Sequence, residues 1–501
     1  MELSLPALLE RIDDFLFERN ATRFRYAAGL QADGSELKHF TAFAEFGRAE
    51  ALQEVQELAE SPRTEESRKP KLNVLLAFLR QTFLEARSAQ LADDVSRALE
   101  TTRVMSGAKH WLLAEALRES RNQASRPERD QLERDTSSAL AELRTPFSRR
   151  VDVVLAATAE AKAPSAAHFI ERIHGRSLLD RTDSLKSFLK ETADPYRDVL
   201  AFALKKVDST LKPLHAKLHD LERAMQAPWL FELFRREDLQ HAITHCLGDL
   251  ELHPNANGRI GIDSEPRPGR TPVSRAFDLR VPDELRLLFV ADMGFEPYAH
   301  AFSAWGLALN RALVGKGTHF VERRLGDLSV PASMSLLFES FLGDAGFLKR
   351  YLRVPAARAR EAARVFAFRQ LTAQRRAAAN TLMSMELLRR GPVLPLADEF
   401  EQQLSSALFV EVSKSRFLLD TDVFASDALA LDAWALEEVL HGTLTGRFNE
   451  DFWRNPAAGR WLADFAAKGQ RDDAAAVAAA LGTKSLEVMA SGQRRITVMG
   501  A

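Results

Sequence analysis

An apolar rhythm of three and four residues runs through nearly the whole chain and constrains its fold more than any other feature. Apolar residues at this spacing form one face of an α-helix. The rhythm begins at Leu8, Ile12, Phe15 and Leu16 and recurs almost to the C-terminal end. A Gly- and Pro-rich segment, residues 253–281, interrupts it once and contains two short β-like runs, 259–262 and 276–280. The sequence therefore predicts a mainly all-α protein with one small β-hairpin or sheet near residues 255–281.

The balance of charge excludes several classes of partner. The chain of 501 residues has 68 Lys and Arg against 70 Asp and Glu, a net charge of −2, and this is no basic footprint for nucleic acid or an anionic membrane. No apolar run reaches the ~18–20 residues of a membrane span. A single cysteine, Cys246, excludes an intrachain disulfide, and the first residues lack the features of a secretory signal. We therefore expect the protein in the cytoplasm.

Residues that can carry chemistry follow the β segment. One buried helix face is predicted by the spacing of Tyr298, Phe302, Trp305, Leu309 and Leu313. Glu296 and His300 lie four residues apart and share another face of the same helix. A second apolar stretch, residues 329–344, contains Glu339.

Several short motifs in the second half of the chain occur together in a fixed order. They are Arg267-Pro268-Gly269-Arg270, His300-Ala301-Phe302, Leu337-Phe338-Glu339, Arg447-Phe448, Asn455-Pro456, Gly459, Gly469, Arg471-Asp472 and Leu481-Gly482. With these motifs, residues 250–501 resemble the zinc metallopeptidase family of thimet oligopeptidase and oligoendopeptidase F. The resemblance implies an elongated, two-lobed helical fold around a cleft. We expect an N-terminal helical lobe over 1–200 and a metallopeptidase-like lobe over 201–501 that includes the β segment 253–281.

The zinc motif of that family, HExxH followed by a later glutamate ligand, is degenerate here. Alignment through His300 places this residue at the second zinc histidine, Glu296 at the first, and Pro297 at the glutamate that acts as general base. The third ligand falls on Ala332, seven residues before Glu339. Proline has no titratable group and alanine has no donor. Glu339 lies two helical turns from Ala332, ~10 Å along the axis, so it cannot simply replace the missing ligand.

Active members of the family also use tyrosines from the C-terminal part to stabilise the oxyanion. The four tyrosines of this chain are Tyr26, Tyr196, Tyr298 and Tyr351, and residues 426–441, where we would expect such donors, contain none. The positions Glu296, Pro297, His300 and Ala332 are therefore interpreted as a vestigial zinc site. If any metal binds, His300 and Glu296 are its expected ligands, since a Glu-x-x-x-His pair has workable spacing on a helix.

Further residues are candidates for binding. The resemblance implies that the β segment flanks the substrate cleft, so Arg267, Arg270 and Tyr298 are cleft candidates, although solvated loop arginines are the alternative reading. The pairs His215/His219 and His241/His245 have a spacing that can bind transition metals, and chance pairs are the alternative.

These observations lead to one hypothesis with two alternatives. We expect a catalytically inactive metallopeptidase-like protein, without a cofactor, that binds a peptide or a protein partner. The first alternative is an active zinc oligopeptidase with a non-standard ligand set. The second is a purely structural helical interaction protein. The sequence indicates no oligomeric state.

Overall fold

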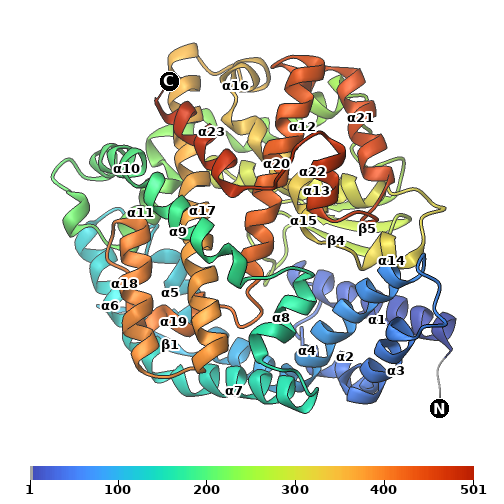
Figure 1. Ribbon diagram of the computed structural model, residues 1–501. Coiled ribbons are helices and arrows are strands. Elements are labelled where there is room, and N and C mark those ends of the chain that lie inside the picture. Colours follow the sequence, from blue (N-terminus) through green and yellow to red (C-terminus); the bar gives the residue numbers. More distant parts are fainter. Residues whose placement is uncertain (1–3, 501) are drawn as a thin grey trace. The chain divides into compact units, whose positions relative to one another are not determined.

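The computed structural model describes residues 4–500 and is mainly helical, as predicted (Figure 1). The prediction that the first residues lack the features of a secretory signal rests partly on residues 1–3, which lie outside the described part. The chain divides into two compact units. Unit 1 contains the stretch that ends at Ser35, Ala227–Ala367 and the stretch that begins at Asp432, and unit 2 contains Glu36–Gln226 and Phe368–Leu431. Each unit therefore combines separate stretches of the chain, whereas the sequence analysis divides the chain once, near residue 200.

Unit 1 consists of helices and one three-stranded sheet. Its helices are α1 (Leu5–Ala27), α12 (Arg236–Asp249), α13 (Phe295–Ala312), α14 (Phe320–Arg324), α15 (Ser329–Ser340), α16 (Ala345–Tyr351), α21 (Pro456–Ala467), α22 (Ala474–Ala480) and α23 (Val488–Gly500), with 3₁₀ turns at Pro228–Leu233, Phe341–Gly343 and Phe452–Arg454. Its strands are β3 (Ile260–Asp263), β4 (Arg275–Arg280) and β5 (Glu284–Leu288). Two long helices, α17 (Ala356–Arg390) and α20 (Ser426–Phe448), each belong partly to unit 1 and partly to unit 2.

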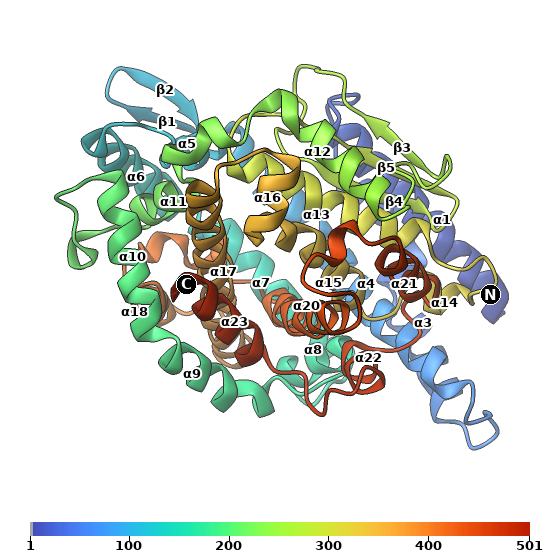
Figure 2. The same cartoon turned by 90° about the horizontal axis from the view of Figure 1, so that it is seen from above.

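The sheet of unit 1 has the strand order β3-β5-β4, with β5 parallel to β3 and antiparallel to β4. The predicted β segment is confirmed by β3 and β4, but the central strand, β5, begins beyond the predicted limit. Helix α1 lies along β4 (Figure 2). There Phe24 packs edge-to-face on Phe277 with ring centroids 5.6 Å apart, and the Asn20 side-chain amide donates to the Asp278 carbonyl oxygen at 2.9 Å. The Arg324 guanidinium donates to the neighbouring Leu279 carbonyl oxygen at 2.8 Å. Side chains thus occupy the outer edge of β4.

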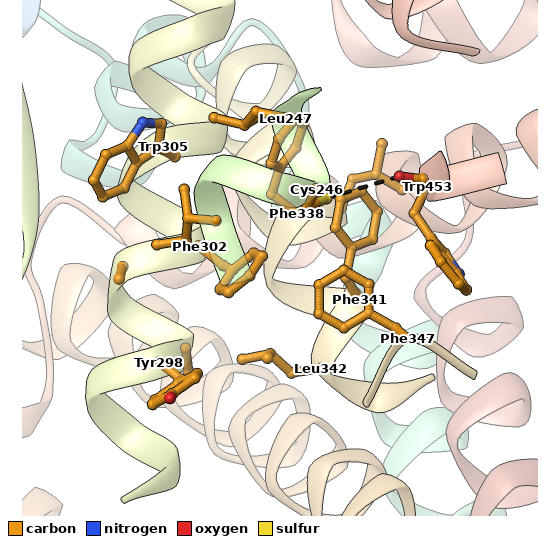
Figure 3. Close-up of a cluster of buried hydrophobic side chains, with 14 of the residues drawn as sticks. Cys246, Leu247, Tyr298, Phe302, Trp305, Phe338, Phe341, Leu342, Phe347 and Trp453 are labelled. Atoms are coloured by element: carbon orange, nitrogen blue, oxygen red, sulfur yellow. Dashed lines mark hydrogen bonds between the residues drawn. The ribbon is translucent and has the colours of Figure 1, made fainter. Parts of the chain in front are cut away.

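The apolar face predicted for residues 298–313 lies in the core of unit 1, except that its last residue, Leu313, is half-buried (Figure 3). Tyr298, Phe302, Trp305 and Leu309 are at most 3% exposed. Phe302 packs edge-to-face on Phe347 of α16 with centroids 5.5 Å apart. A helical spacing of large apolar side chains is what allows one face of α13 to enter this core.

Unit 2 is helical apart from one hairpin. Its helices are α2 (Glu36–Ala42), α3 (Ala49–Glu60), α4 (Lys69–Thr101), α5 (Leu113–Glu119), α6 (Arg126–Glu142), α7 (Arg144–Glu160), α8 (Ala166–His174), α9 (Thr182–Glu191), α10 (Ala193–Val207), α11 (Leu218–Gln226), α18 (Pro395–Leu408) and α19 (Phe417–Asp420), with 3₁₀ turns at Ala44–Gly47, Leu179–Arg181, Pro213–His215 and Lys414–Arg416. None of the helices in residues 4–500 combines the length and apolarity that crossing a bilayer requires.

The hairpin of unit 2 joins β1 (Arg103–Ser106) and β2 (Lys109–Leu112) in antiparallel register, Ser106 opposite Lys109. Sequence analysis missed it. The signal was present in Gly107, which has φ +59° in the two-residue loop, because such hairpin turns favour glycine at positive φ.

Candidate functional site

Helix α13 carries Glu296, Pro297 and His300, three of the positions interpreted as a vestigial zinc site, in its first two turns. It starts at Phe295, directly after Gly294, which has φ +107°. Glu296 and Pro297 therefore lie in the first turn, where proline is tolerated because the first amide groups have no partner within the helix. Because proline is favoured in the first turn, Pro297 by itself indicates a helix that starts there, and the structure places the start two residues earlier.

Helix α15 packs closely against α13. A Cβ atom on Gly306 of α13 would lie only 2.6 Å from the Met334 carbonyl oxygen of α15, so this glycine is what permits the approach. The Ser303 and Ser335 hydroxyl oxygens are 2.8 Å apart, and the Ser335 hydroxyl also lies 2.8 Å from the Ser303 carbonyl oxygen, to which it can donate. The serines therefore fix the register of the two helices.

The two serines lie on the same helix faces as the predicted site positions. Ser303 lies one turn after His300, and Ser335 lies one turn after Ala332 and one turn before Glu339, so each group occupies a single helix stripe. Glu296, His300, Ala332 and Glu339 are all half-buried. The Glu296, His300 and Glu339 side chains each have further interactions within the chain.

The residues at these positions do not fit a zinc ion. Such a site needs three protein ligands, but Glu296 and His300 are the only two donors at the three aligned positions, because the Ala332 side chain is a methyl group. Within residues 4–500, one group of three His, Cys, Asp or Glu side chains has converging ligand atoms, and it consists of Asp130, Glu133 and His219 of unit 2. None of the α13 or α15 positions belongs to that group.

The cluster around His219 is an ion-pair network. His219 is 1% exposed, and its Nε2 atom lies 3.1 Å from Asp130 and 3.6 Å from Glu133 on α6. Its Nδ1 atom lies 3.2 Å from Asp220. Lys217 Nζ also approaches Asp130, at 3.3 Å. Both ring nitrogens and one carboxylate are thus already engaged by charged groups, which a metal ion would have to displace.

Sequence reasoning marked His219 for a different reason, its spacing from His215. The two histidines belong to different elements, because His215 ends the 3₁₀ turn Pro213–His215 and His219 lies in α11. The partners on α6 are 89 residues away in sequence, at Asp130, and no local pattern indicates such a contact. The second pair, His241 and His245, lies exposed on α12 with ring centroids 3.8 Å apart and offers two donors.

Arg267 and Arg270 bind one carboxylate within the sheet region. Arg267 lies 2.8 Å from Asp263 and Arg270 lies 2.6 Å from it, at the end of β3. Arg270 also donates to the Phe289 carbonyl oxygen at 2.8 Å. Burial would raise the pKa of Asp263, but the hydrogen bonds from both arginines outweigh it and lower that pKa. The Arg267 side chain is 22% exposed and the Arg270 side chain 8%. Because both arginines contact Asp263 and Arg270 also contacts Phe289, they connect β3, the following loop and the residue after β5.

Tyr298, the third cleft candidate, belongs to the core. Its side chain is fully buried and packs edge-to-face on Phe234 with ring centroids 5.2 Å apart. Its hydroxyl donates to the Arg235 carbonyl oxygen at 2.5 Å, and burial raises its pKa. Cys246 is buried in the same core with its thiol 3.8 Å from the Trp453 carbonyl oxygen, and burial raises its pKa too.

The segment expected to carry oxyanion tyrosines, residues 426–441, forms most of α20 and holds a buried carboxylate instead. Glu437 is fully buried and pairs with Arg494 at 2.6 Å and Arg495 at 2.7 Å, both from α23. Burial opposes its ionisation, but the two guanidinium charges outweigh burial and lower the pKa of Glu437 to about 2. Burial, followed by the charge of Arg494, lowers the pKa of the neighbouring His441 to about 3. These groups fasten the C-terminal helix within unit 1.

The fold is mainly helical and resembles that of solved peptidase structures. A solved structure assigned as an oligoendopeptidase F aligns with 99% of this chain and 90% of its own at a TM-score of 0.64 and 12% identity. A structure assigned as a peptidase from Chlamydophila abortus aligns with 99% of this chain and 89% of its own at a TM-score of 0.63 and 11% identity. No protein-family model and no curated relative matches the sequence. Since identity is this low, the likeness establishes the fold alone.

Proposed function

We propose that this chain is a metallopeptidase-like protein that has lost zinc-dependent hydrolysis and binds a peptide or a partner protein. The α13–α15 pair carries the proposal. Gly306 and the serine contact hold the two helices together closely, yet Pro297 and Ala332 stand where the resembling family has its general base and third ligand. Proline cannot accept a proton from water, and a methyl group cannot coordinate a metal.

An extended peptide would add to the sheet of unit 1 at β3. The outer carbonyl oxygens of β4 at Asp278 and Leu279 are already occupied by Asn20 and Arg324. β3 forms the other edge, and its Ile262 side chain is 43% exposed. The Arg259 carbonyl oxygen accepts from β5 and the Asp263 carbonyl oxygen accepts from Phe289, which directly follows β5. The alternation of a strand therefore directs the Ile262 amide away from β5. Strand addition uses outward backbone groups of this kind.

Metal analysis tests the loss of hydrolysis. We expect protein purified without chelator to contain zinc far below one ion per chain and to leave a quenched fluorescent peptide library uncleaved, because the donor set is incomplete. The His300→Ala variant should behave in the same way. His241→Ala serves as the matched control, since the exposed pair His241/His245 can collect background metal. Stoichiometric zinc and cleavage, both lost in His300→Ala and kept in His241→Ala, would instead establish the active zinc enzyme.

Peptide binding is tested with fluorescein-labelled peptides from a β-casein digest, followed by anisotropy. We expect saturable binding by the unmodified protein and by Ile262→Thr. Ile262→Pro should weaken it, because proline removes the outward amide while the inward ladder stays intact. Absence of binding in all three proteins would favour the purely structural interaction protein.

A further inference from the structure

A pocket in unit 2, distant in sequence from the α13–α15 positions, has the chemistry of a ligand site. It has a volume of about 380 Å³, within the ~300–1,000 Å³ typical of small-molecule sites. Residues of α6, α7 and α18 line it, together with the segment from Ser413 to Leu419.

The floor of this pocket is apolar. Leu140, Phe147 and Phe417 line it, and each is at most 8% exposed. These three side chains pack against the rest of unit 2 and also border the pocket. An apolar group of a ligand could therefore contact them without any rearrangement that exposes further apolar surface to water.

The polar part of the pocket has an unbalanced positive charge. Among the described residues that line it, none is acidic, and Arg144 and Lys414 are the basic ones. Lys414 is already paired, with its Nζ atom 2.8 Å from Asp398. Arg144 is half-buried and has no hydrogen bond or ion pair with any residue of the described chain. One guanidinium therefore remains uncompensated beside an apolar wall.

Serine hydroxyls complete the polar part. The Ser413 and Ser415 hydroxyl oxygens are 2.9 Å apart, and Ser137 approaches Ser413 at 3.4 Å. A bond between two hydroxyls uses one of the two O–H donors, so a further donor remains for a ligand oxygen.

We propose that this pocket binds a small amphipathic monocarboxylate, such as a medium-chain fatty acid. The single uncompensated charge of Arg144 matches one carboxylate, which a guanidinium can bind through two parallel hydrogen bonds. The serine hydroxyls donate to the same carboxylate, and the alkyl chain lies on Leu140, Phe147 and Phe417. This site is independent of the proposed peptide binding and of any metal.

Calorimetric titration of the full chain tests the site, with octanoate, 1-octanol and acetate as probes. We expect octanoate to bind at one site, 1-octanol to bind at least about tenfold more weakly, and acetate to give no measurable heat, because hydrogen bonds to a charged group and chain burial both contribute. Arg144→Gln should weaken octanoate by at least about tenfold and leave 1-octanol unchanged.

Two further variants keep the test specific. Arg149→Gln, at an exposed position on the same helix outside the pocket, should leave octanoate affinity unchanged. Ala141→Phe fills the pocket from an exposed lining position and should abolish octanoate binding while circular dichroism stays unchanged. The proposal is overturned if octanoate does not saturate, if Arg144→Gln binds it normally, or if a folded Ala141→Phe does so.

Discussion

Single buried charges in this protein are matched by several partners each. His219 shows this best, because carboxylates surround both of its ring nitrogens. Burial opposes its protonation, but the hydrogen bond with Asp220 and the negative charges of Glu133 and Asp220 outweigh burial and raise the pKa of His219. The buried ring therefore holds a proton more readily than a free imidazole does.

The raised pKa makes part of the stability of the protein dependent on pH. The folded pKa lies above the unfolded value of about 6.5, so protonated His219 contributes fully below about pH 6.5, and the contribution is lost as pH rises through the folded pKa. We expect His219→Gln to lower the free energy of unfolding most at about pH 5.5 and progressively less toward about pH 9. Urea unfolding at a series of pH values measures this difference.

His110→Gln is the control, since His110 lies exposed on β2 and should change the free energy of unfolding little at any pH. A difference between the protein and His219→Gln that stays constant over this range would show that the ring acts through packing alone.

The sequence predicts what a side chain can do chemically when its residue type alone decides this, and it does not predict which partners that side chain contacts. That Pro297 cannot act as a base and that Ala332 cannot bind metal needs no coordinates. The pairing of Arg267 and Arg270 with Asp263, and the burial of Tyr298 among aromatic rings, depend on tertiary contacts. A spacing argument cannot distinguish an arginine in solvent from one that fastens two strands. Binding at these residues stays a prediction.

At the scale of elements, the contact between α13 and α15 depends on one missing side chain. Gly306→Ala would place a methyl group 2.6 Å from the Met334 carbonyl oxygen and 3.0 Å from Phe338 Cβ. Because backbone blocks the methyl group, the helices must separate. We expect the free energy of unfolding to fall by ~1–3 kcal/mol in urea denaturation, as for other overpacked cores.

Gly442→Ala is the comparison, for which we expect the free energy of unfolding to rise rather than fall. Gly442 lies exposed within α20, and a Cβ atom there would meet nothing within 4 Å. Alanine is the better helix former, so this variant should stabilise the protein by ~0.5–1 kcal/mol. If Gly306→Ala also stabilised the protein, the close approach of α13 and α15 would be wrong.

Elements with long, regular apolar spacing were predicted well, and short ones were not. The period of α13 gave its buried face, and its first turn was located to within two residues. The hairpin β1–β2 was missed because strands of four residues are too short for alternation to be recognised between helices. The strand β5 was missed because the predicted β segment, residues 253–281, was defined by its glycines and prolines. The strand that pairs with both β3 and β4 lies just beyond that segment.

For the whole molecule, each compact unit is discontinuous along the chain. The stretch that contains α1 joins unit 1 although about two hundred residues separate it from the next part, and Phe368–Leu431 joins unit 2. A reading along the chain detects changes in composition, and it has no signal for stretches that return to an earlier unit. The division into 1–200 and 201–501, and the cleft expected between two lobes, stay predictions.

Fragments test the two divisions against each other. A cut between residues 200 and 201 leaves neither compact unit complete. We expect fragments 1–200 and 201–501, produced separately, to lack near-ultraviolet circular dichroism and to bind a hydrophobic dye, because apolar faces lose their partners. Co-expression should restore the spectrum of the intact chain. A fragment 1–200 that folds alone, with cooperative thermal unfolding, would support the linear division instead.

The closed edge of β4 also bears on how copies of this protein behave when concentrated. An exposed strand edge is a template on which another chain can nucleate an intermolecular sheet, and natural proteins block such edges to remain dispersed. Here an asparagine of α1 and an arginine of α14 occupy the outer β4 carbonyl oxygens. Helices α1 and α14 thereby block the β4 edge of the sheet, and not its β3 edge, against pairing between copies of the protein.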